Sequence, residues 1–338
     1  MNTLCVPSGP ESIQTAADLL RRGQVVAFPT ETVYGLGADA LNDAAVRAIF
    51  TAKERPADNP LIVHVAEQGQ LEGLCHVTDT AKKLMDAYWP GPLTLLLMKT
   101  SRVPDVTTAG LPSVAVRCPR HPVALALLRA CKVPIAAPSA NRSGRPSPTT
   151  AAHVYEDMQG RIPMILDGGN CQVGVESTVV DLTGDIPCVL RPGAITPQDI
   201  AAVAGNCTVA SSVMRPLKEG ERAPSPGMKH RHYAPRAKMT VLVGPDENVT
   251  AEMIRRYDAA ENAVILAHDS LLPAFGPRRA FGLGNSPRES AHLLFQRLRE
   301  MDETGCTLIL AQGWEAQGEG LAVMNRMARA AAFDIVEL

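Results

Sequence analysis

One stretch of sequence decides the fold of the first half of the chain. It covers residues 25–65 and reads VVAFPTETVYGLGADALNDAAVRAIFTAKERPADNPLIVHV. The apolar run Val25–Phe28 ends at Pro29, which cannot donate a ladder hydrogen bond, so a buried strand is predicted to end there. A polar turn follows, and the glycines Gly35 and Gly37 after it are interpreted as part of the same loop.

A helix and a second strand complete this stretch. Asn42 or Asp43 is suited to cap the helix, whose apolar residues share one face, and the helix is expected to stop near Pro56. Leu61–Val65 is then predicted to be a buried strand. Small-molecule sites in α/β sheets lie outside strand ends, so this stretch is the first place to expect chemistry.

Each polar residue here also has a purely structural interpretation. Lys53 and Arg55 suit the negative end of a helix dipole, and Gly-Leu-Gly without a third glycine is no dinucleotide fingerprint. The cluster indicates more than its members do, because these two cations, hydroxyls, Asn59 and His64 all fall near two strand ends.

Composition limits the class of protein. A length of 338 residues favours two domains, and a hydrophobic content of 46% is enough for buried cores. The net charge of −2 shows no chain-wide bias towards nucleic acid. Neither a signal peptide nor an apolar stretch of about 20 residues is found, so a cytoplasmic protein without a membrane span is expected. The eight cysteines include no CxxC pair, which argues against a disulfide scaffold or a structural zinc site.

The remaining sequence predicts an α/β protein in three parts. Residues 1–205 are predicted to form a mixed sheet with helices, 206–236 a linker without periodicity, and 237–338 a smaller, mainly parallel α/β domain. The expected helices are Ser12–Arg22, Thr80–Tyr88, Pro122–Cys131, 150–158, Pro197–Val203, Val249–Tyr257, Pro287–Met301 and Leu321–Ala332. The expected further strands are Leu93–Met98, Val114–Arg117, Val133–Ala137, Met164–Leu166, Ser177–Leu182, Val189–Arg191, Met239–Val243, Ala263–Ala267 and Thr307–Leu310.

Charge is distributed unevenly in the first part. Residues 106–155 contain no Asp or Glu but six cations. Such a window predicts a local positive field that attracts phosphates or RNA. The alternative is that the acidic partners of these cations lie elsewhere in the chain. The linker segment 225–235, SPGMKHRHYAP, either docks onto an anion or is a solvated basic linker.

Three common catalytic and phosphate-binding motifs are missing from the sequence. It has no GxxxxGK[ST], GxSxG or HExxH pattern. Chemistry by positioning and electrostatics between bound substrates fits the residues better.

Several of these stretches together resemble one known family, the YrdC-like threonylcarbamoyl-AMP synthases, in their two-domain form. The resemblance lies in the motifs PTETVYGLG (29–37), KERPADNPLIVHV (53–65), WPGPLTLLL (89–97), VAVRCPRHP (114–122), APSANRSGRPSPT (137–149), ESTVVDL (176–182), VLRPGAI (189–195) and the linker segment 225–235.

The resemblance implies a YrdC-like fold with a Rossmann-like C-terminal domain, and a nucleotidyltransferase reaction. L-threonine, bicarbonate and ATP with Mg²⁺ would give L-threonylcarbamoyl-AMP and pyrophosphate. The product would serve downstream transferases that modify the adenosine beside the anticodon in tRNAs reading ANN codons. Weak direct binding of RNA or tRNA is a further expectation.

The resemblance also implies residue roles. The threonine-binding positions would be Thr32, His64, Arg117, Ala137 and Ser177. The nucleotide-binding positions would be Arg55, Asn59, Ser113, Ser139, Ser147, Arg191 and, from the linker that would cover the site, Tyr233. Lys53 and Arg55 would be catalytic, with Lys53 neutralising phosphate or carbamate charge, and no Mg²⁺ ligand is assigned.

Two other functions remain as alternatives. The basic window fits an RNA-binding module without catalysis, although an aromatic content of 4% argues against base stacking. Carbamoyl transfer in hydrogenase maturation uses a similar domain, but that context brings zinc-finger-like segments that this sequence lacks.

Overall fold

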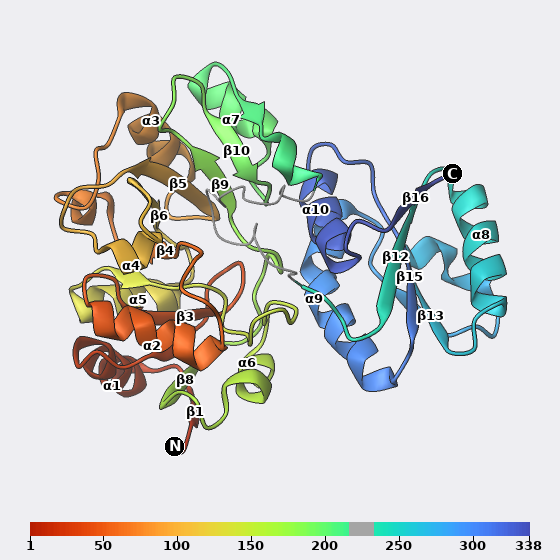
Figure 1. The fold of residues 1–338 in the computed structure, drawn as a ribbon, viewed down its shortest axis with the longest axis horizontal. Coiled ribbons are helices and arrows are strands. Elements are labelled where there is room, and N and C mark those ends of the chain that lie inside the picture. Colours follow the sequence, from red (N-terminus) through yellow and green to blue (C-terminus); the bar gives the residue numbers. More distant parts are fainter. Residues whose placement is uncertain (216–232) are drawn as a thin grey trace.

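Two β-sheets, each with its own helices, make up the computed structural model, which describes residues 1–215 and 233–338 (Figure 1). The first sheet is mixed and has eleven strands in the order β1-β8-β2-β3-β7-β4-β6-β5-β9-β10-β11. Their bounds are β1 Leu4–Pro7, β2 Val26–Phe28, β3 Gly35–Asp39, β4 Ile62–His64, β5 Leu93–Met98, β6 Ser113–Arg117, β7 Ile135–Ala136, β8 Met164–Asp167, β9 Thr178–Asp181, β10 Cys188–Arg191 and β11 Thr208–Val209.

Helices cover this sheet and begin where local capping signals predict. Asn42, Thr78 and Thr150 each accept hydrogen bonds from the first turn of the helix that follows them. The helices of this part are α1 Pro10–Arg21, α2 Asp43–Lys53, α3 Asp79–Tyr88, α4 Asp105–Thr108, α5 Pro122–Cys131, α6 Ala151–Met158 and α7 Pro197–Ala204, and the 3-10 helices are η1 Gln68–Leu71 and η2 Ser211–Val213.

The glycine-rich segment after the Thr30–Val33 turn is a strand, so its interpretation as a loop was wrong. β3 runs antiparallel to β2 and continues into a pairing with β7. A Cβ at Gly37 would lie 2.8 Å from Cε1 of Phe28 and 2.9 Å from Cγ2 of Ile135. Close packing therefore requires glycine here, and the low strand propensity of glycine hid the strand.

The second sheet is parallel throughout, as the alternation of strands and helices predicts. Its order is β14-β13-β15-β12-β16. The elements are β12 Lys238–Val243, α8 Asp246–Asp258, β13 Ala263–Ala267, η3 Asp269–Phe275, β14 Ala280–Gly282, α9 Pro287–Thr304, β15 Leu308–Gln312, α10 Gly320–Ala330 and β16 Ile335–Glu337. The short strands β1, β11, β14 and β16 had no clear signal in the sequence.

The two parts share a hydrophobic core at their junction. Helices α9 and α10 face the first sheet (Figure 1), and Val33 and Val175 belong to the same buried cluster as Leu294 and Met327. Of the expected linker, 206–236, only 206–215 and 233–236 are described, and β11 joins the first sheet through β10. No helix within residues 1–215 or 233–338 is long and apolar enough to cross a membrane.

Candidate active site

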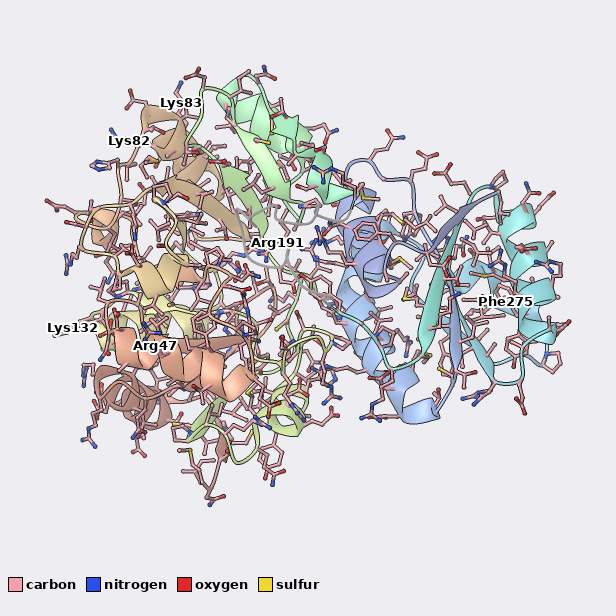
Figure 2. The ribbon with its side chains drawn as sticks, in the orientation of Figure 1. Arg47, Lys82, Lys83, Lys132, Arg191 and Phe275 are labelled. Carbon is pink, nitrogen blue, oxygen red and sulfur yellow. The ribbon has the colours of Figure 1, made fainter. Side chains whose placement is uncertain are left out.

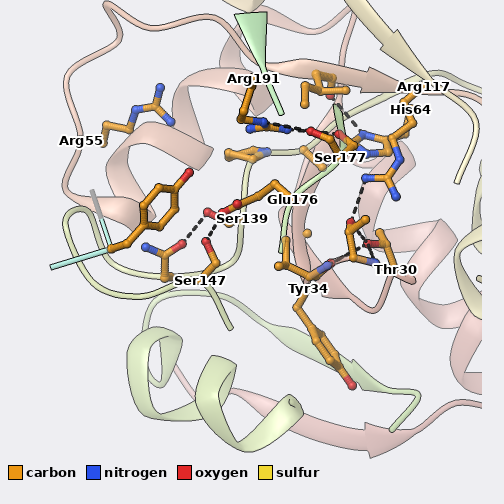
Figure 3. Close-up of a pocket in the computed structure, with 18 residues that line it drawn as sticks. Thr30, Tyr34, Arg55, His64, Arg117, Ser139, Ser147, Glu176, Ser177 and Arg191 are labelled. Atoms are coloured by element: carbon orange, nitrogen blue, oxygen red, sulfur yellow. Dashed lines mark hydrogen bonds between the residues drawn. The ribbon is translucent and has the colours of Figure 1, made fainter. Parts of the chain in front are cut away.

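A polar pocket lies where the turn after β2, the ends of β4, β6 and β10, and the segments after β7 and before β9 meet (Figure 3). Its lining residues are Thr30, Thr32, Val33, Tyr34, Gly35, Arg55, Ile62, His64, Arg117, Ala137, Pro138, Ser139, Asn141, Ser147, Glu176, Ser177, Arg191 and Tyr233. Arg191 lies near the junction of the two parts, whereas Lys82, Lys83 and Lys132 lie at the outer edge of the molecule (Figure 2).

Arg117, the last residue of β6, is held from two sides. Its Nε–H donates to the carbonyl of Gly91 at 3.2 Å, and its Nη1–H donates to Oγ1 of Thr32 at 2.9 Å. Its Nη2 lies 2.8 Å from Oε1 of Glu31, with both side chains below 5% exposed. This contact is an ion pair, and neither Nη2 nor the two Glu31 oxygens make a well-formed hydrogen bond with a side chain among the described residues.

Glu31 is therefore a buried carboxylate whose charged partner is Arg117. Burial raises the pKa of Glu31, but the neighbouring Arg117 guanidinium outweighs this effect and the pKa is lowered below its ordinary value. The ion pair keeps Arg117 extended towards the pocket, where its unused hydrogen-bonding capacity suits a carboxylate ligand.

His64, at the end of β4, is an uncharged acceptor. Burial, helped by the charge of Arg117, lowers the pKa of His64 to about 3. Its Nδ1 lies 3.1 Å from the carbonyl of Ile62, and because a carbonyl only accepts, Nδ1 carries the proton. Nε2 is then left with a lone pair that can accept a hydrogen bond from a ligand.

A second buried arginine flanks Ser177 on the side away from Arg117. The Nε–H of Arg191 donates to the carbonyl of Ser177 at 3.0 Å, and an Nη2–H donates to its Oγ at 3.1 Å. Burial lowers the pKa of Arg191 to about 10, partly offset by Glu176, so the guanidinium stays charged at neutral pH. Figure 3 shows Ser177 between Arg191 and Arg117.

The end of α2 places one further cation at the pocket. Glu54 adopts a left-handed conformation after Lys53, so the chain leaves the helix before Arg55. An Nη2–H of Arg55 donates to the carbonyl of Asn59 at 3.1 Å, and its Nε has no partner among the described residues. Burial lowers the pKa of Arg55 to about 10, so this guanidinium is also charged.

Lys53 is used differently. Its Nζ donates to the carbonyls of Ser139 at 2.5 Å and Asn141 at 2.6 Å. Burial, followed by the charge of Arg55, lowers the pKa of Lys53 well below its ordinary value. Lys53 fixes the segment that follows β7 rather than reaching the pocket itself.

Ten of the thirteen predicted site residues line this one pocket: Arg55, Thr32, His64, Arg117, Ala137, Ser177, Ser139, Ser147, Arg191 and Tyr233. Lys53, Asn59 and Ser113 do not line it. Ser113 begins β6, the strand that Arg117 ends, and Asn59 is buried with its side-chain atoms unpartnered among the described residues.

Three of the six cations of the acid-free window have acidic partners outside it. Arg117 pairs with Glu31, Arg142 with Glu54 at 2.6 Å, and Arg145 with Glu156 at 2.6 Å. The positive field expected from this window is therefore reduced in the folded protein.

Sequence reasoning missed two acids that support the site. Glu31 was placed in a polar turn, and Glu176 was noted only beside two hydroxyl residues. Both are buried, at 1% and 6% exposure. Glutamates are rarely buried without a partner, but the sequence does not show which arginines they meet.

The described residues do not form a metal centre of their own. No cluster of three His, Cys, Asp or Glu side chains occurs in residues 1–215 and 233–338. Glu176 is the single acid among the described lining residues, and its two oxygens bond Ser147 and Arg326.

Comparison with known proteins identifies the family of this chain. The sequence profile of a family described as telomere recombination matches residues 18–193, and that of the threonylcarbamoyl-AMP synthase C-terminal domain matches residues 195–332. The threonylcarbamoyl-AMP synthase of Pyrococcus abyssi is 47% identical over 331 residues, which are 96% of each chain. That of Bacillus subtilis is 45% identical, covering 96% of this chain and 94% of its own.

A solved structure extends the likeness to three dimensions. The crystal structure of P. abyssi Sua5 complexed with L-threonine superposes with a TM-score of 0.93 at 45% identity, covering 100% of this chain and 99% of that one. The chain therefore belongs to the threonylcarbamoyl-AMP synthase family, in the form that carries the additional C-terminal domain.

Proposed function

We propose that this chain makes L-threonylcarbamoyl-AMP and pyrophosphate from L-threonine, bicarbonate and Mg·ATP. The observation that carries the proposal is the pair of buried arginines on either side of Ser177. Arg117 and Arg191 are 3% and 6% exposed and line the same pocket. Two guanidinium groups at one site suit a pair of ligands with a carboxylate at one end and phosphates at the other, because each group can donate two parallel hydrogen bonds.

L-threonine is assigned to the side of Arg117. The related P. abyssi protein was crystallised with L-threonine, which supports a threonine subsite in this chain. Arg117 would bind the carboxylate, and the Nε2 lone pair of His64 would accept a hydrogen bond from the amine or the hydroxyl group. Thr32, Ala137 and Ser177 would complete this side of the pocket.

ATP is assigned to the side of Arg55 and Arg191. Ser139 and Ser147 line that side, and Lys53 holds the backbone from which Ser139 projects. Hydroxyl and guanidinium donors fixed by buried contacts are suited to phosphate oxygens. Tyr233 also lines this side and is 4% exposed.

The chemistry needs no nucleophile from the protein. The threonine amine attacks the carbon of bicarbonate-derived CO₂, loses a proton and becomes a carbamate. A carbamate oxygen then attacks the α-phosphorus of ATP, the bond from this phosphorus to the bridging oxygen breaks, and Mg·pyrophosphate leaves. The protein holds the carbamate in line with that bond and neutralises the charge of the phosphates, as in other phosphate chemistry.

The product carries an activated carbonyl joined to AMP through a mixed anhydride. We propose that a separate transferase in the cytoplasm uses it to modify the adenosine beside the anticodon of ANN-reading tRNAs. The alternative of an RNA-binding module without catalysis receives less support, because three cations of the basic window pair with acids.

Isotope labelling tests the proposed reaction. The protein is incubated with ATP, L-threonine and ¹³C-bicarbonate, and the nucleotides are separated rapidly and analysed by mass spectrometry. The proposal predicts an AMP adduct that contains both threonine and one ¹³C atom. An adduct without the label, or AMP alone under conditions in which synthetic product survives, would refute the proposed reaction.

A further inference from the structure

The C-terminal domain approaches the pocket closely. Val33 and Tyr233 line the pocket and also belong to the buried cluster that contains Phe295 and Val323. The Tyr233 ring stacks on that of Phe295, with 5.0 Å between centroids. This junction also buries three arginines of the C-terminal domain, Arg326, Arg299 and Arg329, and the first two bond residues beside the pocket. Buried guanidinium groups are costly unless they are paired and hydrogen-bonded.

The first is Arg326 of α10, whose side chain is 0% exposed. Its Nε–H donates to Oε2 of Glu176 at 2.7 Å, and its Nη1–H groups donate to the carbonyl of Pro192 at 2.9 Å and to Asn325 at 2.8 Å. The other carboxylate oxygen of Glu176 accepts a hydrogen bond from the Ser147 hydroxyl at 2.5 Å. Glu176 therefore links the C-terminal domain directly to a serine that lines the pocket.

The second is Arg299 of α9, whose side chain is 3% exposed. Its Nη2–H groups donate to the carbonyl of Pro146 at 2.6 Å and to Oδ2 of Asp157 at 2.6 Å. Asp157 has a side chain with 0% exposure and also pairs with Arg145. Arg299 thus fixes the residue that precedes Ser147, while Arg326 fixes the side chain of Ser147 through Glu176.

We propose that the C-terminal domain builds the nucleotide side of the pocket, with Arg326 and Arg299 as positioning residues that hold Ser147 from two directions. The inference rests on the proposed function, because it assumes that the phosphates of ATP lie beside Ser147. It assigns a role in ATP binding to the C-terminal domain, residues 237–338, which supplies none of the expected site residues because Tyr233 belongs to the linker.

Charge explains why arginine is used here. Glu176 is the single acid among the described lining residues, and without a partner its charge would face the phosphates of ATP. The Arg326 guanidinium, followed by that of Arg191, outweighs the effect of burial and lowers the pKa of Glu176. Arg326 therefore neutralises the carboxylate and orients it, and Ser147 is aligned as a consequence.

The main experiment measures two affinities in one variant. Arg326→Met removes the guanidinium group and keeps a long apolar side chain. Calorimetry should show an ATP affinity lower by about tenfold or more, since the loss of an orienting partner typically has that effect. The affinity for L-threonine, measured without ATP, should change by less than about twofold, because the proposed threonine side is held by Thr32 and Glu31.

Charge rescue separates positioning from packing. In Arg326→Met the carboxylate of Glu176 loses its ion-pair partner, and adding Glu176→Gln removes that charge while keeping an oxygen for Ser147. The double variant should bind ATP more tightly than Arg326→Met. Arg297→Met is the matched control, because Arg297 lies on α9 but bonds only Glu300 and Gly282 of its own domain among the described contacts.

Three results would overturn the inference. The first is that folded Arg326→Met binds ATP as tightly as the wild type. The second is that this variant loses ATP and threonine affinity equally and has a lower melting temperature. The third is that the double variant binds ATP no more tightly than Arg326→Met. If Arg326→Met does not fold, Arg326→Lys replaces it, because lysine keeps the charge but lacks the planar guanidinium group. Arg326→Lys should still weaken ATP binding, and unchanged ATP affinity in this variant would also overturn the inference. Failure of the wild-type protein to bind ATP would instead refute the proposed function.

Discussion

The ion pair between Arg117 and Glu31 allows stability and substrate binding to be separated. Arg117→Met leaves a carboxylate that is 1% exposed and has lost its ion-pair partner. Removing one partner of a buried pair destabilises a protein by about 3–5 kcal/mol. We expect a loss of this size in the free energy of unfolding at pH 7, measured by urea denaturation with fluorescence detection.

The destabilisation caused by Arg117→Met should depend on pH, because it involves the charge of Glu31. In the wild-type protein the pKa of Glu31 is lowered, so its stabilising contribution is complete above its ordinary pKa and is lost as pH falls through the lowered value. In Arg117→Met the guanidinium is gone, so burial, the largest effect, raises that pKa against the smaller opposing effect of backbone hydrogen bonds from Glu31 and Arg120. Glu31 then takes up a proton as pH falls, so the destabilisation relative to wild type should shrink from pH 7 to pH 5.

A double variant completes the test. Glu31→Gln combined with Arg117→Met removes the unpaired charge, so much of the lost stability should return. Threonine affinity should stay reduced by about tenfold to a hundredfold in both variants, the range for a lost charge-assisted bond. A loss in Arg117→Met below about 1 kcal/mol, or one that grows on acidification, would refute the reasoning.

Three further changes probe other parts of the site. Arg55→Ala should lower ATP affinity by about tenfold or more with the melting temperature retained, and unchanged binding by calorimetry would show that the nucleotide lies elsewhere. The pKa of His64 is lowered to about 3 from 6.5, so its neutral form contributes full stability above pH 6.5 and progressively less below. The wild-type protein therefore loses about 2 kcal/mol of stability at pH 5 through His64. His64→Gln lacks this effect, so its free energy of unfolding should fall by about 2 kcal/mol less than that of the wild type between pH 7 and pH 5. Gly37→Ala should cost about 1–3 kcal/mol through its contact with Phe28, whereas Gly69→Ala, with nothing within 4 Å, should be nearly neutral in the same denaturation assay.

The elements with strong local signals were predictable from the sequence. Pro122–Cys131 and Leu93–Met98 have the bounds expected, because a proline at the helix start and an unbroken apolar run act within a few residues. The strand Gly35–Asp39 was not predictable, since its glycines are required by side chains of Phe28 and Ile135, which come from other strands.

The site could be predicted in part for the same reason. Its arginines and hydroxyls fall at strand ends, which a sequence pattern reveals. The sequence pattern does not reveal the acidic partners of these arginines. Glu176 and Arg326 are separated by 150 residues, and Asp157 and Arg299 by 142. Such pairs form only when two domains pack together, so the contribution of the C-terminal domain had no local signal.

Pyrophosphate release tests the central claim most directly. The purified protein is given Mg·ATP with both L-threonine and bicarbonate, and then with each omitted in turn from carbon dioxide-depleted buffer. The proposed reaction predicts release only when both are present, because the carbamate that attacks ATP contains atoms from each. Release of pyrophosphate that needs neither substrate, or no release from a folded protein that binds ATP and threonine, would contradict it.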